Sequence, residues 1–313
     1  MKIVICVKQV PDTSDIKWTE NNTIQREGLE SILNPYDAFA IESALKIKKS
    51  VENVETIAIT MGPMQANEVI RKSLALGIDD GFVISDKKFA GADTIATSRT
   101  LAIAISNRIG KFDLILCGQF AIDGDTAQTP PMIAQNLGLP QVTFVKEILE
   151  VNENSVKVKR VVEDGEEIVE AQLPCLLAMI KSDLVLTRPL INGFIRAQKY
   201  DVPVYSMEDI GMSSDSVGIK GSPTYVSKAF RPEQKRLGMK IKPDSVNHAV
   251  EVILENINDW KQRYFDICTI NKKQRSSSSS FRIGFWGSKT FWKTEWWNNS
   301  SSFANWWWKF RWN

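Results

Sequence analysis

The sequence predicts an α/β fold: a doubly wound, mostly parallel sheet with a β-hairpin extension and a C-terminal arm. Three observations lead to this fold class. Up to about residue 140, short apolar runs alternate with amphipathic stretches, as in sheets covered by helices on both faces. Beyond Pro140 the pattern changes to strands joined by turns. One isolated amphipathic stretch then follows a long irregular region near the C-terminus.

The first part of the chain contains four apolar runs of strand length, each bounded by turn residues or by a helical pattern. These predicted strands are Ile3–Val7, Thr56–Thr60, Gly81–Ser85 and Phe112–Cys117.

Helix start and stop signals separate these strands. Asn34 and Pro35 predict an N-cap followed by a first helical residue, and Gly77 predicts the end of a helix at Leu76. Asp93 begins a third predicted helix, and a fourth, Pro131–Leu137, ends at Gly138.

The second part reads as strands and then irregular chain. The predicted strands are Thr143–Val151, Ser155–Val162, Glu167–Leu173 and Leu176–Ile180. Residues 183–245 are rich in loop signals, and Ser245–Lys261 predicts a helix. That helix carries the apolar stripe Val246, Val250, Ile253 and Ile257. An isolated stripe of this kind indicates an arm that packs on another surface.

The composition excludes several function classes. The single histidine, His248, rules out metal sites with two histidines, and it makes a Ser–His–Asp hydrolase a weak hypothesis. The four cysteines are far apart in the sequence, which favours buried reduced thiols over a local metal motif. No GxG or P-loop motif is present. Residues 1–270 are mildly acidic, so we expect no nucleic-acid partner.

The last 43 residues differ from the rest of the sequence. Residues 271–313 contain eight of the ten tryptophans, two serine runs and eight of the basic residues. Neither a helical nor a strand period organises these aromatics. We favour a non-native extension over a Trp-rich membrane-interface segment. The chain has no window apolar enough for a membrane span and no signal-peptide pattern, so a cytoplasmic protein is expected.

A polar loop follows the fourth predicted strand and reads GQFAIDGDTAQTPP from Gly118. Ligands in parallel sheets bind beyond the carboxyl ends of the strands, and this loop lies at such an end. Its backbone N–H groups and threonine hydroxyls are suited to a phosphate. Asp123 and Asp125 would repel a phosphate, so they are expected to cap turns or meet ribose and adenine donors. A well-capped crossover loop without a ligand remains the alternative.

Five segments together resemble the β subunit of electron transfer flavoproteins. These are VKQVPDT from Val7, NPYDAFAIESAL from Asn34, TMGPMQANEVIRKSLALGIDD from Thr60, DLILCGQFAIDGDTAQTPPMIAQNLGLPQVT from Asp113 and VKRVVEDGEEIVEAQLPCLLA from Val158. Their order and spacing cover about residues 1–265, whereas the tail has no counterpart. The resemblance implies an adenine nucleotide hydrolase-like domain (1–225), an arm that packs on the α subunit (226–270) and a disordered or non-native tail (271–313).

The resemblance also implies a nucleotide site. Its expected contacts are Cys6, Asn34, Pro35, Tyr36, Asp37, Met61, Gly118, Gln119, Phe120, Ala121, Ile122, Asp123, Gly124, Asp125, Thr126, Ala127, Gln128 and Thr129. In simple members of the family this site holds AMP, and in flavin-bifurcating members it holds FAD that NADH reduces. No catalytic side chain and no metal are expected.

The segment FAGADTIATS from Phe89 resembles bifurcating members, in which Thr94 and Thr97 would contact the flavin. Two further features favour FAD. Gly124 would let the backbone approach a bulky ligand, and N–H-rich helix starts near Asp93 and Pro130 would share a pyrophosphate. Capping threonines in a first helical turn are the simpler interpretation.

The implied function is electron transfer between NADH, ferredoxin and an acyl-CoA or hydroxy-acid dehydrogenase, in a heterodimer with an α subunit. Ile191, in the segment Asp183–Lys199, is the nearest match to an apolar anchor that docks the dehydrogenase. Arginines beside apolar residues in this segment suit a transient interface. The alternatives are a non-bifurcating β subunit with structural AMP and a stand-alone adenine-nucleotide-binding module.

Overall fold

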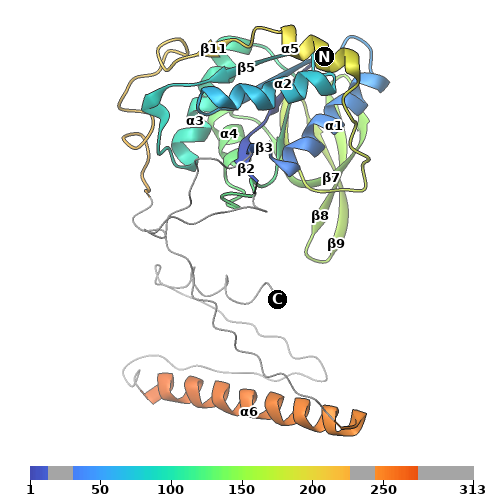
Figure 1. Ribbon diagram of the computed structural model, residues 1–313, viewed down its shortest axis with the longest axis vertical. Helices are drawn as coiled ribbons and strands as arrows, with labels where there is room; N and C mark the ends of the chain where they lie inside the picture. Colours follow the sequence, from blue (N-terminus) through green and yellow to red (C-terminus); the bar gives the residue numbers. More distant parts are fainter. Residues whose placement is uncertain (13–30, 226–243, 274–313) are drawn as a thin grey trace. The chain divides into compact units, whose positions relative to one another are not determined.

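The computed structural model describes residues 1–12, 31–225 and 244–273 (Figure 1). It divides into two compact units, Met1–Glu233 and Gln234–Asn313. The predictions for residues 226–243 of the arm and for residues 274–313 of the tail lie outside the described residues. The predicted subdivision into arm and tail therefore stays a prediction.

A nine-stranded sheet forms the centre of the first unit, with the order β11-β5-β4-β1-β6-β10-β7-β8-β9. The parallel strands are β1 (Lys2–Cys6), β4 (Glu55–Met61), β5 (Asp80–Ile84), β6 (Leu114–Gly118), β7 (Gln141–Val151), β10 (Cys175–Met179) and β11 (Val204–Tyr205). The antiparallel extension is β8 (Ser155–Val162) and β9 (Gly165–Gln172). The predicted doubly wound, mostly parallel sheet is confirmed, and every predicted strand is present within two residues of its expected bounds.

Helices cover both faces of this sheet. They are α1 (Pro35–Ser50), α2 (Asn67–Leu76), α3 (Thr94–Ala104), α4 (Thr129–Leu137) and α5 (Ile191–Lys199). Side chains of α1, α2 and α5 belong to one core cluster, and side chains of α3 and α4 belong to the other. The helix predicted over 131–137 begins two residues earlier in the structure, at Thr129.

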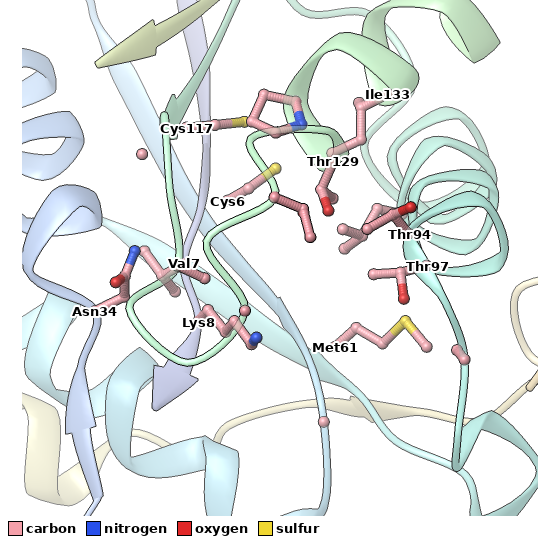
Figure 2. Close-up of a pocket in the computed structure, with 18 of the residues that line it drawn as sticks. Cys6, Val7, Lys8, Asn34, Met61, Thr94, Thr97, Cys117, Thr129 and Ile133 are labelled. Atoms are coloured by element: carbon pink, nitrogen blue, oxygen red, sulfur yellow. The ribbon is translucent and has the colours of Figure 1, made fainter. Parts of the chain in front are cut away.

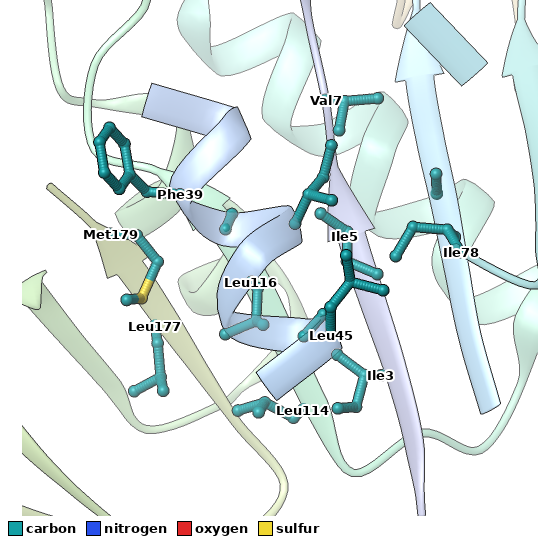
Figure 3. Packing of buried hydrophobic residues seen from close by; sticks show 14 of the residues in the cluster. Ile3, Ile5, Val7, Phe39, Leu45, Ile78, Leu114, Leu116, Leu177 and Met179 are labelled. Carbon is teal, nitrogen blue, oxygen red and sulfur yellow. The ribbon is translucent and has the colours of Figure 1, made fainter. Parts of the chain in front are cut away.

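The core between α1 and the sheet is mostly aliphatic, with Phe39 of α1 as an aromatic member near Met179 of β10 (Figure 3). Leu45 of α1 belongs to the same cluster as Ile5 of β1 and Leu116 of β6. The central strands are buried on both faces, which explains why they read as continuous apolar runs rather than as alternating patterns.

Several elements were not predicted. The region 183–245 was expected to be loop-rich, but it contains α5 and also β11, which adds a parallel edge strand beside β5. A two-stranded antiparallel sheet of β2 (Gln9–Pro11) and β3 (Ser31–Leu33) was likewise missed. The third predicted helix changes to a π-helical turn at Ile105–Ile109.

Contacts with other elements hold α5 in place. The Arg71 guanidinium donates to the carbonyl oxygens of Ala197 (2.7 Å) and Tyr200 (2.9 Å), at the C-terminal end of the helix. A Cβ on Gly193 would lie 2.4 Å from the carbonyl oxygen of Ala75, so α5 approaches α2 at backbone distance. These partners are distant in sequence, which is why local patterns did not reveal the helix.

The second unit contains α6 (Val246–Lys273), which extends beyond the predicted end at Lys261. The four residues of the predicted apolar stripe, Val246, Val250, Ile253 and Ile257, are exposed, and so is Leu254 beside them. Within the described residues of this unit, no other helix or strand covers this face.

Candidate functional site

A cavity of about 720 Å³ lies where the order of the parallel strands reverses. The strand β1 has β4 on one side and β6 on the other, and such a switch point is where α/β sheets bind ligands. The cavity is lined from the carboxyl ends of β1, β4 and β6 and from the first turns of α3 and α4 (Figure 2). The loop after β6 therefore lies at a ligand-sized cavity.

Most of the predicted contacts line this cavity. They are Cys6, Asn34, Asp37, Met61, Thr94, Thr97, Gly118, Gln119, Phe120, Ala121, Gly124, Asp125, Thr126, Ala127, Gln128 and Thr129. Pro35, Tyr36, Ile122 and Asp123 are not among the lining residues. Three of these four make contacts that fix the loop in place. Tyr36 packs edge-on against Phe120, Ile122 donates its N–H to Asn34, and Asp123 pairs with Lys8.

The residues that line the cavity after β5, here called the second lobe, were not predicted as contacts, although the segment from Phe89 was singled out. They are Ser85, Asp86, Lys87, Phe89 and the segment 90–92. Gly62, Pro63 and Met64 after β4 also line the cavity. The sequence contained the information needed to predict this lining. The strand β5 is parallel to β4, so its carboxyl end must reach the same edge of the sheet.

Asn34 fixes the loop after β6 to the start of α1. It occupies the predicted N-cap position, but its side chain does not cap the helix. Its amide instead donates to the carbonyl oxygen of Phe120 (2.7 Å) and accepts from the N–H of Ile122 (3.3 Å). The residue thus holds the backbone of the loop from two sides.

Asp37 lies below the cavity and is 5% exposed. Its carboxylate accepts from the N–H of Lys8 (2.7 Å), the N–H of Gly118 (3.1 Å) and the side-chain amide of Asn34 (2.9 Å). Burial raises the pKa of Asp37 to about 7, although these hydrogen bonds and the charge of Lys8 lower it. The carboxylate therefore joins the ends of β1 and β6, and its oxygens are engaged by the protein itself.

An ion pair connects the loop after β6 to the residues that follow β1. Lys8 Nζ lies 2.7 Å and 2.8 Å from the two carboxylate oxygens of Asp123. Asp123 was expected to cap a turn or meet a nucleotide donor; the structure shows it paired with Lys8, and the nucleotide contact stays a prediction.

Gly124, the glycine singled out in the sequence, is not where the loop adopts left-handed backbone. Asp125 and Ala127 adopt positive φ values of 47° and 56°, whereas Gly124 does not. A Cβ on Gly124 would meet nothing within 4 Å. Left-handed backbone at two non-glycine residues is strained, and such strain is typical of ligand-binding loops.

The two helix starts carry fewer free N–H groups than predicted. Asp93 caps α3 with hydrogen bonds from the N–H groups of Ile95 (3.0 Å) and Ala96 (2.9 Å), so a carboxylate already occupies that helix end. Pro130 and Pro131 remove two donors from the first turn of α4. A pyrophosphate shared between these helix starts stays a prediction, with fewer N–H groups free to bind it than expected. The starts are nevertheless adjacent, because Thr94 donates to Gln128 at 2.9 Å.

The comparisons with known proteins agree with this architecture. The model of the electron transfer flavoprotein domain matches residues 21–206. The chain is 42% identical over 260 residues to the caffeyl-CoA reductase-Etf complex subunit CarD of Acetobacterium woodii, covering 83% of this chain and 98% of that protein. The chain belongs to the electron transfer flavoprotein family. The predicted resemblance is thereby confirmed, and electron transfer is the function of the family.

Two further relatives match most of this chain. The electron transfer flavoprotein subunit beta of Megasphaera elsdenii is 40% identical, with 82% of this chain and 98% of that protein covered. The acryloyl-CoA reductase electron transfer subunit gamma of Anaerotignum propionicum is also 40% identical, with 77% and 92% covered. No helix in the described ranges of this family member is long and apolar enough to cross a membrane.

The Lys8–Asp123 pair gives a first prediction. We expect Lys8→Ala to weaken nucleotide binding several-fold by freeing the loop, while changing the unfolding free energy by about 1 kcal/mol or less, because exposed pairs contribute little. Equilibrium titration with AMP and FAD measures the effect. Lys46→Ala, which breaks the exposed Lys46–Glu147 pair away from the cavity, is the matched control. Equal affinities for the Lys8 variant and the parent would contradict this role.

Proposed function

We propose that the chain is the β subunit of an electron transfer flavoprotein of the bifurcating type, with FAD in the cavity described above. The observation that carries this proposal is the second lobe after β5. Its residues Lys87 and Phe89 line the same cavity as Gln119 and Phe120 after β6. A dinucleotide has two halves that can contact these two groups of residues, whereas a mononucleotide has one.

The lining residues fit such a ligand. Threonine hydroxyls at positions 94, 97 and 129 face the cavity from the starts of α3 and α4 (Figure 2). Phe89, Leu101 and Ile133 supply apolar surface for a ring system, and Lys87 supplies a cation for an anionic group. A bound flavin would supply the one- and two-electron redox chemistry that the side chains lack. The protein would hold its phosphates and rings and exclude water.

The names of the relatives suggest the wider assembly. Two of them belong to CoA-ester reductase systems, the caffeyl-CoA and acryloyl-CoA reductases. We infer that this chain also serves an acyl-CoA or hydroxy-acid dehydrogenase, with NADH as electron donor and ferredoxin as second acceptor. A β subunit with structural AMP is the competing assignment for the same cavity.

The cofactor content of the purified heterodimer tests this proposal. We expect two FAD and no AMP per dimer after co-expression with the α subunit, measured by flavin absorbance and by chromatography of the released nucleotides. One FAD and one AMP would identify the non-bifurcating type. A dimer without flavin, or a chain that binds adenine nucleotide alone, would support the stand-alone nucleotide-binding module and overturn the proposal.

The exposed stripe of α6 is the surface we assign to the α subunit. Five apolar side chains of this helix, between Val246 and Ile257, are 45–80% exposed. Burial of each would contribute roughly 1.5–3 kcal/mol. An apolar stripe of this length is more typical of a partner interface than of a free surface.

Ile191 is the anchor that we assign to the dehydrogenase. It is 80% exposed at the start of α5, beside the exposed side chains of Leu190, Phe194 and Ile195. Arg196, one of the arginines of this segment, donates from its guanidinium to the carbonyl oxygens of Leu74 (2.6 Å) and Ile78 (2.7 Å), so we base the interface on the apolar side chains. The apolar cluster remains available to a partner.

Substitution of Ile191 by alanine tests the docking surface. We expect electron delivery to the dehydrogenase to slow about tenfold, because removing a central apolar anchor costs more than 1 kcal/mol of binding. Stopped-flow transfer kinetics measure the rate, and flavin content should not change. Ile168→Ala on β9, a similarly exposed isoleucine, is the control. Unchanged transfer kinetics in the Ile191 variant would contradict the assignment.

A further inference from the structure

Two cysteine thiols lie side by side at the floor of the nucleotide cavity. Cys6 ends β1 and Cys117 lies near the end of β6, and the two residues are direct partners in the parallel register. Both line the cavity (Figure 2). Cys6 is an expected nucleotide contact, but the electron-transfer role proposed above needs the redox chemistry of neither sulfur, so the pair has no assigned reaction.

The spacing of the pair suits a reversible covalent link. Partners on neighbouring strands have Cα atoms about 4.8 Å apart, and disulfides span Cα distances of about 4.4–6.8 Å. In-register side chains leave the sheet on the same face, so both sulfurs point into the same space. A disulfide would still need the two Cβ atoms to approach to about 3.8 Å, which makes the bond strained and easily reduced.

The two thiols differ in access. Cys6 is partly exposed in the cavity, whereas Cys117 is 3% exposed. The hydrogen bond with Cys6 and burial hold the pKa of Cys117 well above its usual value. Cys6 is therefore the sulfur that a reagent in the cavity meets first, and Cys117 is the second, resolving sulfur.

We propose that Cys6 and Cys117 form a redox modification site which a small disulfide oxidises when the cavity is empty. The Cys6 thiolate attacks the small disulfide, forms a mixed disulfide and releases one thiol. The Cys117 sulfur then attacks Cys6, forms the Cys6–Cys117 bond and releases the second thiol. Two protein thiols are oxidised, and the small disulfide is reduced to two thiols that take up the two protons.

The link would affect the nucleotide site because of where it forms. Lys8, two residues after Cys6, and Gly118, directly after Cys117, donate backbone hydrogen bonds that Asp37 accepts. Drawing the strand ends together would shift these donors. A ligand in the cavity would in turn cover the thiols, a consequence that rests on the proposed nucleotide site. The disulfide then weakens nucleotide binding by the same factor as bound nucleotide disfavours the disulfide.

The test uses the full chain carrying Cys268→Ser, so that only the three cysteines of the first unit remain. The chain is incubated with cystamine, and the Cys6–Cys117 peptide pair is followed by mass spectrometry without reduction. We expect the linked pair to form in this chain and in the added Cys175→Ser variant. Cys175 lies at the opposite end of the neighbouring strand, against Leu114. Cys6→Ser should form no link, and dithiothreitol should restore both thiols in the parent.

Addition of nucleotide distinguishes failure of the thiol-pair proposal from failure of the proposed nucleotide site. FAD or AMP at about ten times its dissociation constant should slow formation of the link about tenfold, because only the empty fraction reacts. A linked pair that forms equally fast with and without nucleotide would overturn the proposed nucleotide site and leave the thiol pair standing. Absence of the Cys6–Cys117 link in the nucleotide-free chain, or a mixed disulfide at Cys6 that never resolves, would overturn the thiol-pair proposal itself.

Discussion

Gly118→Ala should lower the free energy of unfolding by about 3 kcal/mol and abolish nucleotide binding at micromolar concentrations. A Cβ at this position would lie 2.3 Å from the Asp37 carboxylate oxygen and 2.8 Å from the backbone of Tyr36 and Asp37. The start of α1 is packed on β6 and gives way only with a backbone shift. The carboxylate would also lose its hydrogen bond from the Gly118 N–H. Urea denaturation and nucleotide titration measure the two effects.

Gly124→Ala is the matched control in the same loop. Its Cβ would meet nothing within 4 Å, and its φ is not in the left-handed region. The unfolding free energy should change by no more than about 0.5 kcal/mol. If both variants lose stability equally, the close approach of Gly118 to α1 is not what constrains this position.

The parts of the fold predicted from sequence are those whose stability is local or strongly patterned. The buried strands read as apolar runs, and Gly77 and Gly138 mark helix ends by chemistry that acts within one turn. The helix α5 escaped prediction because its support is tertiary. Arg71 holds its C-terminal carbonyl groups from a position far back in the sequence, and β11 exists only as a partner of β5.

The same distinction applies to the site: its location follows from the strand order, whereas its supporting contacts join residues distant in sequence. The switch-point rule locates the cavity, since it needs only the strand order and the strand ends. The rule does not show how side chains support the loop. Lys8 and Asp123 are 115 residues apart in the chain, and Asn34 reaches Phe120 across 86 residues. Pairings at such distances in sequence leave no periodic signal, so the contacts that Asp123 and Asn34 make within the protein were not predicted.

Asp37→Asn should change how stability depends on pH. Burial raises the pKa of Asp37 to about 7 in the folded chain, against an ordinary value of 3.8. Between these two values the folded state holds a proton at Asp37 that the unfolded state has released, so this carboxyl's contribution to stability falls as pH rises. The groups that face it are the Lys8 charge, the Asn34 amide and the neighbouring thiol of Cys117.

The difference in unfolding free energy, parent minus Asp37→Asn, should therefore fall by up to about 4 kcal/mol from pH 4 to pH 7 and stay constant above that. Urea denaturation at each pH measures it. Asp79→Asn is the control, because hydrogen bonds with Lys48 and Thr56 outweigh burial and hold the pKa of Asp79 below its ordinary value. Its parent-minus-variant difference should be flat from pH 5 to pH 8. A flat profile for Asp37→Asn as well would mean that Asp37 stays ionised throughout this range, held by the N–H groups of Lys8 and Gly118.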